Sequence, residues 1–211
     1  MKERSNKIMR AIIVGSMILL SIYSFIIIAL ELKFGQAYIR HYMTDIEGPV
    51  RFFAINTSIS VFLLWSCAVL FLLIISITEN WTNRGHDRLF YISQVLLFLY
   101  LGVDDRFKVH EPLGGIVGFN DAFVLLIIGA GELAVLYFLG NLKQYPKKVL
   151  LYLFVAGAFF GAMVFIDGFV QSELVLRLSL EDLTKTWASF FLFMFAWEIC
   201  RDNIRRLRVA S

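Results

Sequence analysis

The segment LGVDDRFKVHEP, residues 101–112, gathers acidic, basic and imidazole side chains within a strongly apolar chain. Carboxylates and imidazole are frequent general acids and bases in enzymes, and together they also bind divalent metals. Asp104, His110 and Glu111 are therefore the candidate catalytic residues. The groups of this segment that can carry charge or exchange a proton are Asp104, Asp105, Arg106, Lys108, His110 and Glu111.

A continuous helix through this segment would bring only some of these groups together. Residues four and seven apart share one helical face, so Asp104, Lys108 and Glu111 would converge while Asp105 would point elsewhere. We expect His110 to join them only if the helix distorts near the proline that follows Glu111. Asp104 would lie about 10 Å below Glu111, at ~1.5 Å per residue, inside the apolar part of the span.

Two further acids lie within apolar segments. Glu132 stands in GAGELAVL with no charged neighbour within a helical turn, and Asp167 stands in FIDGFV. A carboxylate in the membrane is costly and by default indicates a functional site. One interpretation is therefore a shared polar cavity that opens to the outer side. The competing interpretation pairs each acid with a cation such as Arg106, Lys108 or Lys185, or leaves it protonated.

A metal site is one form that such a cavity could take. Carboxylates with one imidazole suit Zn, Mn, Fe or Ca, depending on geometry. The sequence holds no HExxH, HxxxH or CxxC pattern that would specify the metal. The candidate ligands are Asp104, His110, Glu111 and Asp167.

Acidic and basic residues alternate ahead of the last apolar segment. On a helix their spacing of four forms a ladder of ion pairs. The alternative interpretation turns Glu181 and Lys185 toward Asp104 and Glu111, as partners at the outer face. The four residues are Glu173, Arg177, Glu181 and Lys185.

The composition predicts an integral membrane protein. Of the 211 residues 59% are hydrophobic and 18% charged, whereas a soluble domain has about 45–50% apolar and about 25% charged residues. Several apolar runs approach the ~20 residues that cross a bilayer. We predict an all-α polytopic membrane helix bundle with six transmembrane helices, in a single domain over residues 1–211. The expected spans are Ile8–Leu30, Phe52–Thr78, Leu89–Val103 continuing toward Glu111, Ala122–Leu142, Val149–Phe169 and Leu183–Cys200.

The distribution of lysine and arginine predicts the orientation of these spans. Thirteen of the 20 would lie on the side that holds both termini, and seven on the other. Because basic residues concentrate in cytoplasmic loops, we expect both termini in the cytoplasm and the segment 101–112 at the outer face. The net charge of +3 reflects these loops and ends and does not indicate nucleic-acid binding.

Three short elements together resemble a class of uncharacterised bacterial multi-pass membrane proteins. They are a D-[DE]-x(4)-H-E pattern at residues 104–111, the sequence FIDG, and LEDLTKTW at the start of the last span. The resemblance covers roughly residues 95–200. It implies a multi-pass protein of the cytoplasmic (inner) membrane and no particular activity.

Three functions fit these residues, and the sequence does not choose among them. As an enzyme, the chain would be a metal-assisted hydrolase or transferase that acts on a membrane lipid. As a transporter, it would bind protons or a cation at Asp104, Glu132 and Asp167. As a structural or accessory subunit, with a membrane-protein partner or a second copy of itself, it would use the acids in internal ion pairs.

Thiol labelling of intact cells checks the predicted orientation. In a background without Cys67 and Cys200, Gly115→Cys is expected to react with an impermeant thiol reagent, because residues 104–121 would face outward. Gln144→Cys is expected to react only after the membrane is permeabilised. Labelling of position 144 but not of position 115 in intact cells would contradict the orientation.

Overall fold

The apolar segments fold into helices in the structure of the chain, a computed structural model that describes residues 2–43, 54–78, 85–110, 121–171 and 174–210. The elements bounded within these ranges are seven α-helices and one short 3-10 helix, with no strand among the described residues. This confirms the all-α class. The elements are α1 (Lys2–Phe34), α2 (Gln36–Met43), α3 (Ile55–Ile77), α4 (Gly85–Phe107), α6 (Asp121–Phe138), η1 (Leu142–Gln144), α7 (Lys147–Phe169) and α8 (Arg177–Ala210).

Three of the described helices are long and apolar enough to cross a membrane. They are α3, α7 and the part of α1 from Ile13 to Phe34. Large aromatic side chains stand on their outer surfaces: Phe25 and Phe154 are each 74% exposed and Phe62 is 71% exposed. Extended apolar surfaces of this kind suit contact with lipid rather than with water. These features indicate a membrane protein with three candidate spanning helices.

The centre of the bundle is built around α3 and α8. α3 packs against both α4 and α8, and α7 packs along α8. Phe71 of α3 is fully buried and stacks on Phe98 of α4, with 5.8 Å between the ring centres. Phe195 of α8 contacts the same ring at 6.4 Å. This aromatic cluster holds the three helices together on the side of the bundle away from α2.

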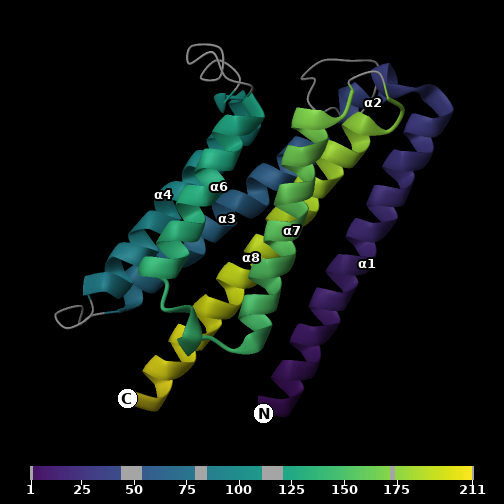
Figure 1. Ribbon diagram of the computed structural model, residues 1–211. Coiled ribbons are helices and arrows are strands. Elements are labelled where there is room, and N and C mark those ends of the chain that lie inside the picture. Colours follow the sequence, from purple (N-terminus) through teal and green to yellow (C-terminus); the bar gives the residue numbers. More distant parts are fainter. Residues whose placement is uncertain (1, 44–53, 79–84, 111–120, 172–173, 211) are drawn as a thin grey trace.

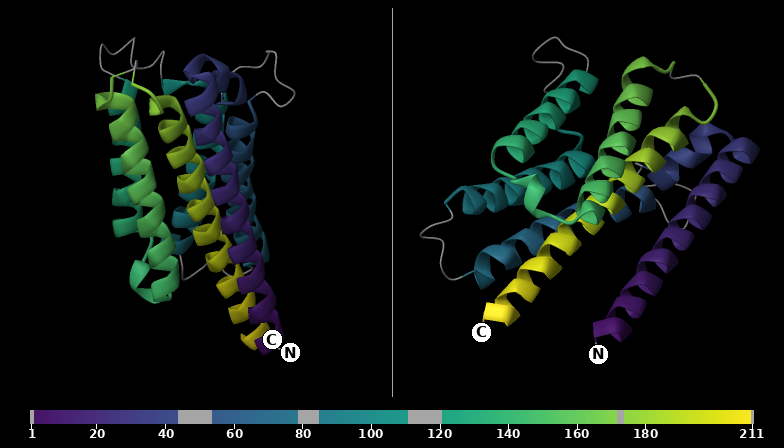
Figure 2. Two further views of the ribbon diagram at one scale, coloured as in Figure 1. Left: turned by 90° about the vertical axis from the view of Figure 1, so that its right-hand side faces the viewer. Right: turned by 60° about the horizontal axis from the view of Figure 1, so that its bottom comes forward.

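The two ends of the bundle differ in what they contain. The first turns of α1 and the last turns of α8 lie at the same end, and α2 lies at the other (Figures 1 and 2). At the α2 end, the buried Glu31 of α1 accepts a hydrogen bond from the backbone N–H of Leu176 at 3.0 Å. This bond ties the end of α1 to the residue that precedes α8.

α4 ends earlier than a continuous helix through Glu111 would require. Its last residue is Phe107, and Lys108 adopts a left-handed conformation with φ of 52°. Left-handed backbone is unfavourable for residues other than glycine and interrupts a right-handed helix. The predicted continuation of this helix toward Glu111 was therefore wrong, and Glu111 and Pro112 themselves lie outside the described residues.

Truncation of the central aromatic ring tests this packing. Phe71→Ala is expected to lower the free energy of unfolding by roughly 3 kcal/mol, because the ring leaves a cavity among three helices. Phe62→Ala on the same helix removes an exposed ring and is expected to change it by less than about 0.5 kcal/mol. Chemical unfolding in detergent measures both, and equal losses would contradict the central role of Phe71.

Candidate functional site

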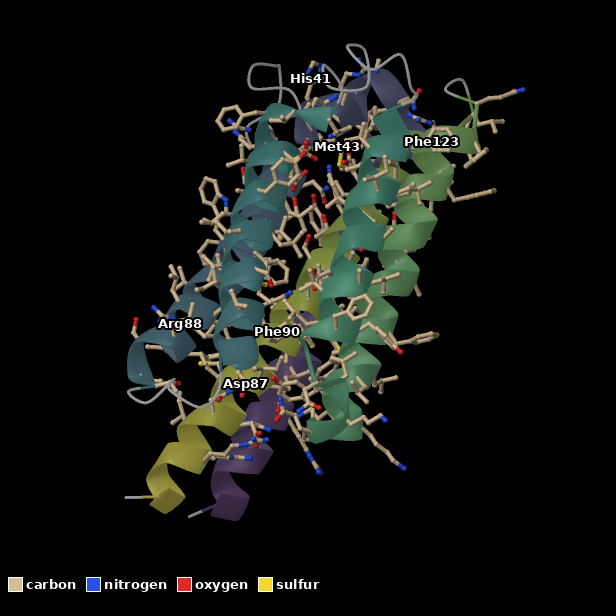
Figure 3. The ribbon with its side chains drawn as sticks, turned by 60° about the vertical axis from the view of Figure 1, so that its left-hand side comes forward. His41, Met43, Asp87, Arg88, Phe90 and Phe123 are labelled. Carbon is tan, nitrogen blue, oxygen red and sulfur yellow. The ribbon has the colours of Figure 1, made fainter. Side chains whose placement is uncertain are left out.

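A cavity of about 240 Å³ lies at the α2 end of the bundle. In Figure 3, Met43 of α2 and Phe123 of α6 mark this end, and Phe90 of α4 lies toward the other. Charged groups of the lining come from α2, α4, the residues that follow α4, α7 and α8: Arg40, Asp104, Asp105, Lys108, His110, Asp167, Arg177, Glu181, Asp182 and Lys185. Apolar lining residues come from α3, α4, α6, α7 and α8: Leu64, Leu101, Leu125, Phe160, Met163, Leu178, Ala188 and Leu192.

Asp104 holds His110 at two points. Its Oδ1 accepts a hydrogen bond from the backbone N–H of His110 at 2.7 Å, and its Oδ2 lies 2.8 Å from the imidazole Nδ1. The left-handed backbone at Lys108 ends α4 two residues before His110, so His110 does not continue the helix of Asp104. Asp104 is only 4% exposed. A carboxylate beside Nδ1 fixes the orientation of the ring and favours the tautomer in which Nε2 is the basic nitrogen.

Lys185 bridges two carboxylates, neither of which is Asp104, and its other expected partner, Glu111, lies outside the described residues. Its Nζ lies 2.8 Å from Asp105 Oδ1 and 2.7 Å from Asp182 Oδ1. Asp105, which was expected to point away from the other groups, therefore faces the cavity. Ser60 of α3 donates a hydrogen bond to the second oxygen of Asp105. This cluster joins α3, α4 and α8.

Asp167 binds Arg177, a cation that the sequence argument did not pair with it. One guanidinium nitrogen of Arg177 lies 3.0 Å from Asp167 Oδ1 and donates to the backbone carbonyl of Asp167 at 2.9 Å. The other nitrogen lies 3.0 Å from Glu181 Oε2. The structure thus contains one pair of the expected charge ladder, Arg177–Glu181. Lys185 instead forms an ion pair with Asp105 of α4, and Glu173 lies outside the described residues.

The proposed metal ligands are only partly assembled. Asp104 and His110 are in contact, whereas Asp167 is engaged by Arg177. Within the described ranges, no three His, Cys, Asp or Glu side chains are placed to hold a metal ion. Glu111 lies outside these ranges, so a metal site that includes it stays a prediction.

Comparison with known protein families finds one family whose sequence model covers most of the chain. The sequence model of a family described as a domain of unknown function, DUF8692, matches residues 12–199. The chain belongs to the DUF8692 family. No curated protein and no solved structure matches it. The match includes every charged and apolar residue that lines the cavity, so the cavity belongs to the DUF8692 domain.

Glu132 has a partner that the sequence argument did not name. The amide Nε2 of Gln94 in α4 donates a hydrogen bond to Glu132 Oε1 at 2.7 Å. Neither residue lines the cavity. The DUF8692 chain therefore keeps this acid apart from the other intramembrane acids and gives it a neutral partner in place of a cation.

Several residues that complete the site were missed from the sequence. Asp182 was not singled out, and Arg177 was expected in the charge ladder but not as the partner of Asp167. Asn56 of α3 donates to the backbone carbonyl of Asp182 at 3.1 Å and accepts from Thr186 at 2.9 Å. Polar residues such as Asn56 and Ser60 within the apolar run of residues 52–78 were the available signal, because a polar group in lipid requires an internal partner.

Removal of Lys185 tests the central ion-pair cluster. Lys185→Met leaves Asp105 and Asp182 buried without their cation, and such a change costs roughly 3–5 kcal/mol. Lys148→Met is the matched control: Lys148 is 42% exposed and binds Glu198 at 2.6 Å, but Glu198 also pairs with Arg201. We expect about 1 kcal/mol or less for this control. Thermal unfolding in detergent compares the two, and a Lys185→Met protein as stable as the control would contradict the cluster.

Proposed function

We propose that the chain is a six-span protein of the cytoplasmic membrane, with both termini in the cytoplasm and the cavity facing outward. Two observations support this topology. The start of α1 and the end of α8 share one end of the bundle, as an even number of crossings requires. α4 has 23 residues and is therefore about 35 Å long, enough for the ~30 Å apolar core of a bilayer.

Within this topology we propose that the protein is a hydrolase or transferase that acts on a lipid. The observation that carries the proposal is the double contact of Asp104 with His110 at the wall of the cavity. An imidazole held by a carboxylate is suited to take a proton from an attacking water or hydroxyl group. A divalent metal bound with the help of Glu111 would be an addition to this pair, and it stays a separate prediction.

The proton transfers can be written for a water molecule that attacks an ester. His110 accepts a proton from the water through Nε2, and the water oxygen forms a bond to the acyl carbon or phosphorus. The ester bond to the leaving oxygen then breaks, and His110 returns the proton to that oxygen. Asp104 keeps the imidazole oriented and stabilises its positive charge while it holds the proton.

The lining of the cavity favours an amphipathic substrate. Five carboxylates and four basic side chains line it, which leaves a net charge of −1 with His110 neutral. A nearly balanced lining suits a zwitterionic or uncharged polar group better than a multiply charged one. Leu125, Phe160 and Met163 supply an apolar wall against which the first carbons of a lipid chain can pack. The volume of about 240 Å³ suits a headgroup and these carbons rather than a whole lipid.

Lipid turnover by the purified protein tests this function. The protein is incubated with vesicles of a total bacterial lipid extract, and mass spectrometry follows loss of lipids and gain of products. His110→Gln and Asp104→Asn are expected to lower the rate by about 10²–10⁴-fold, with unchanged melting temperature, because the general base is lost or misoriented. His41→Gln, outside the cavity lining, is the histidine control and should keep the rate. Full turnover in His110→Gln, or no turnover of any lipid by the unmodified chain, would refute the proposal.

A further inference from the structure

Glu132 and Gln94 form a polar pair in the middle of two helices that are otherwise joined by apolar contacts. Glu132 lies on α6 and Gln94 on α4, and 2.7 Å separates Gln94 Nε2 from Glu132 Oε1. Gln94 is completely buried. Glu132 is followed one helical turn later by Val135 and Leu136, which contribute to the apolar core. The pair is separate from the cavity and takes no part in the chemistry proposed there.

The hydrogen bonds of this pair are incomplete when Glu132 is ionised. Gln94 Oε1 is buried and has no hydrogen-bond partner among the described residues. An ionised carboxylate can only accept hydrogen bonds, so it cannot satisfy a neighbouring carbonyl oxygen. An unpaired buried acceptor costs about 1–3 kcal/mol. The pair therefore lacks one hydrogen atom that could be donated to Gln94 Oε1.

The charge of an ionised Glu132 would also be uncompensated. The hydrogen bond from the neutral amide of Gln94 is its polar contact among the described residues, and no cation forms an ion pair with it there. Of the cations that could have served, Lys185 is bound between Asp105 and Asp182. The residues three and four positions from Gln94 on α4 and from Glu132 on α6 carry no charge. Partial burial without an opposite charge favours the neutral carboxyl.

We propose that Glu132 and Gln94 form a proton-binding site between α4 and α6. The bound proton sits on the carboxyl of Glu132, which donates its O–H to Gln94 Oε1 and accepts the N–H of Gln94 at its other oxygen. The two side chains then make a cyclic pair with two hydrogen bonds and no net charge. One proton thus gives the unpaired carbonyl oxygen of Gln94 a donor and removes the charge of the half-buried Glu132.

This site also joins the two helices on either side of it. The Gln94–Glu132 contact is the one side-chain hydrogen bond from α6 to another helix within the described residues. Loss of the proton would remove one hydrogen bond and place a charge between α4 and α6. Because α6 supplies Leu125 to the cavity wall, the protonation state of Glu132 acts on a helix that shapes the cavity.

Infrared spectroscopy of the purified protein in lipid distinguishes a bound proton from a bare carboxylate. The spectrum of Glu132→Gln is subtracted from that of the unmodified protein at neutral pH. We expect the variant to lose the carbonyl band of a protonated carboxyl and to keep its melting temperature, since the amide mimics the neutral acid. Loss of a carboxylate band instead would overturn the proposal.

Two further variants and one change of buffer complete the test. Glu198→Gln is the control for an ionised glutamate. Because Glu198 pairs with Lys148 and Arg201, its replacement should remove a carboxylate band instead of the band of a protonated carboxyl. Gln94→Leu should retain the Glu132 carboxyl band but shift it to higher frequency, because the hydrogen bonds to the amide are lost. An unshifted band would show that Gln94 is not part of the site. Conversion of the carboxyl band to a carboxylate band when sodium replaces choline in the buffer would show a cation site and overturn the assignment to a proton.

Discussion

The position of Lys185 between Asp105 and Asp182 is the contact on which the α2 end of the bundle depends. The three groups come from two helices that are far apart in the sequence. The side chains of Asp105 and Asp182 are buried, so their charges require the partly exposed Lys185 between them. The cluster fixes α4 against α8, and Ser60 extends it to α3. Since Asp104 directly precedes Asp105, the same contact sets where the Asp104–His110 pair lies.

Five acids at the α2 end and on α6 have three different kinds of partner. Among the described residues, Asp105, Asp182 and Asp167 contact basic side chains, Asp104 contacts an imidazole and a backbone N–H, and Glu132 contacts a neutral amide. These solutions differ in what they permit. An ion pair holds helices together, a carboxylate–imidazole pair can pass a proton to a substrate, and an acid–amide pair stores a proton out of contact with the cavity.

The sequence predicts the helical class better than it predicts how the charged side chains pair. The all-α class and the presence of helices apolar enough to span a membrane follow from composition and local pattern. The pairing of Lys185 with α4, of Asp167 with Arg177 and of Glu132 with Gln94 depends on which helices pack side by side, and local spacing carries no information about that. The turn at Lys108 was missed for a different reason: a lysine gives no sign that its backbone is left-handed.

Both described ends of the chain lie away from the cavity, at the opposite pole of the bundle (Figure 1). A protein that binds the first turns of α1 or the last turns of α8 would therefore contact the opposite end of the molecule and would not block the cavity. Attachment and chemistry are spatially separated, so the protein can be tethered, recruited or fused at its tails without competing with whatever enters the cavity.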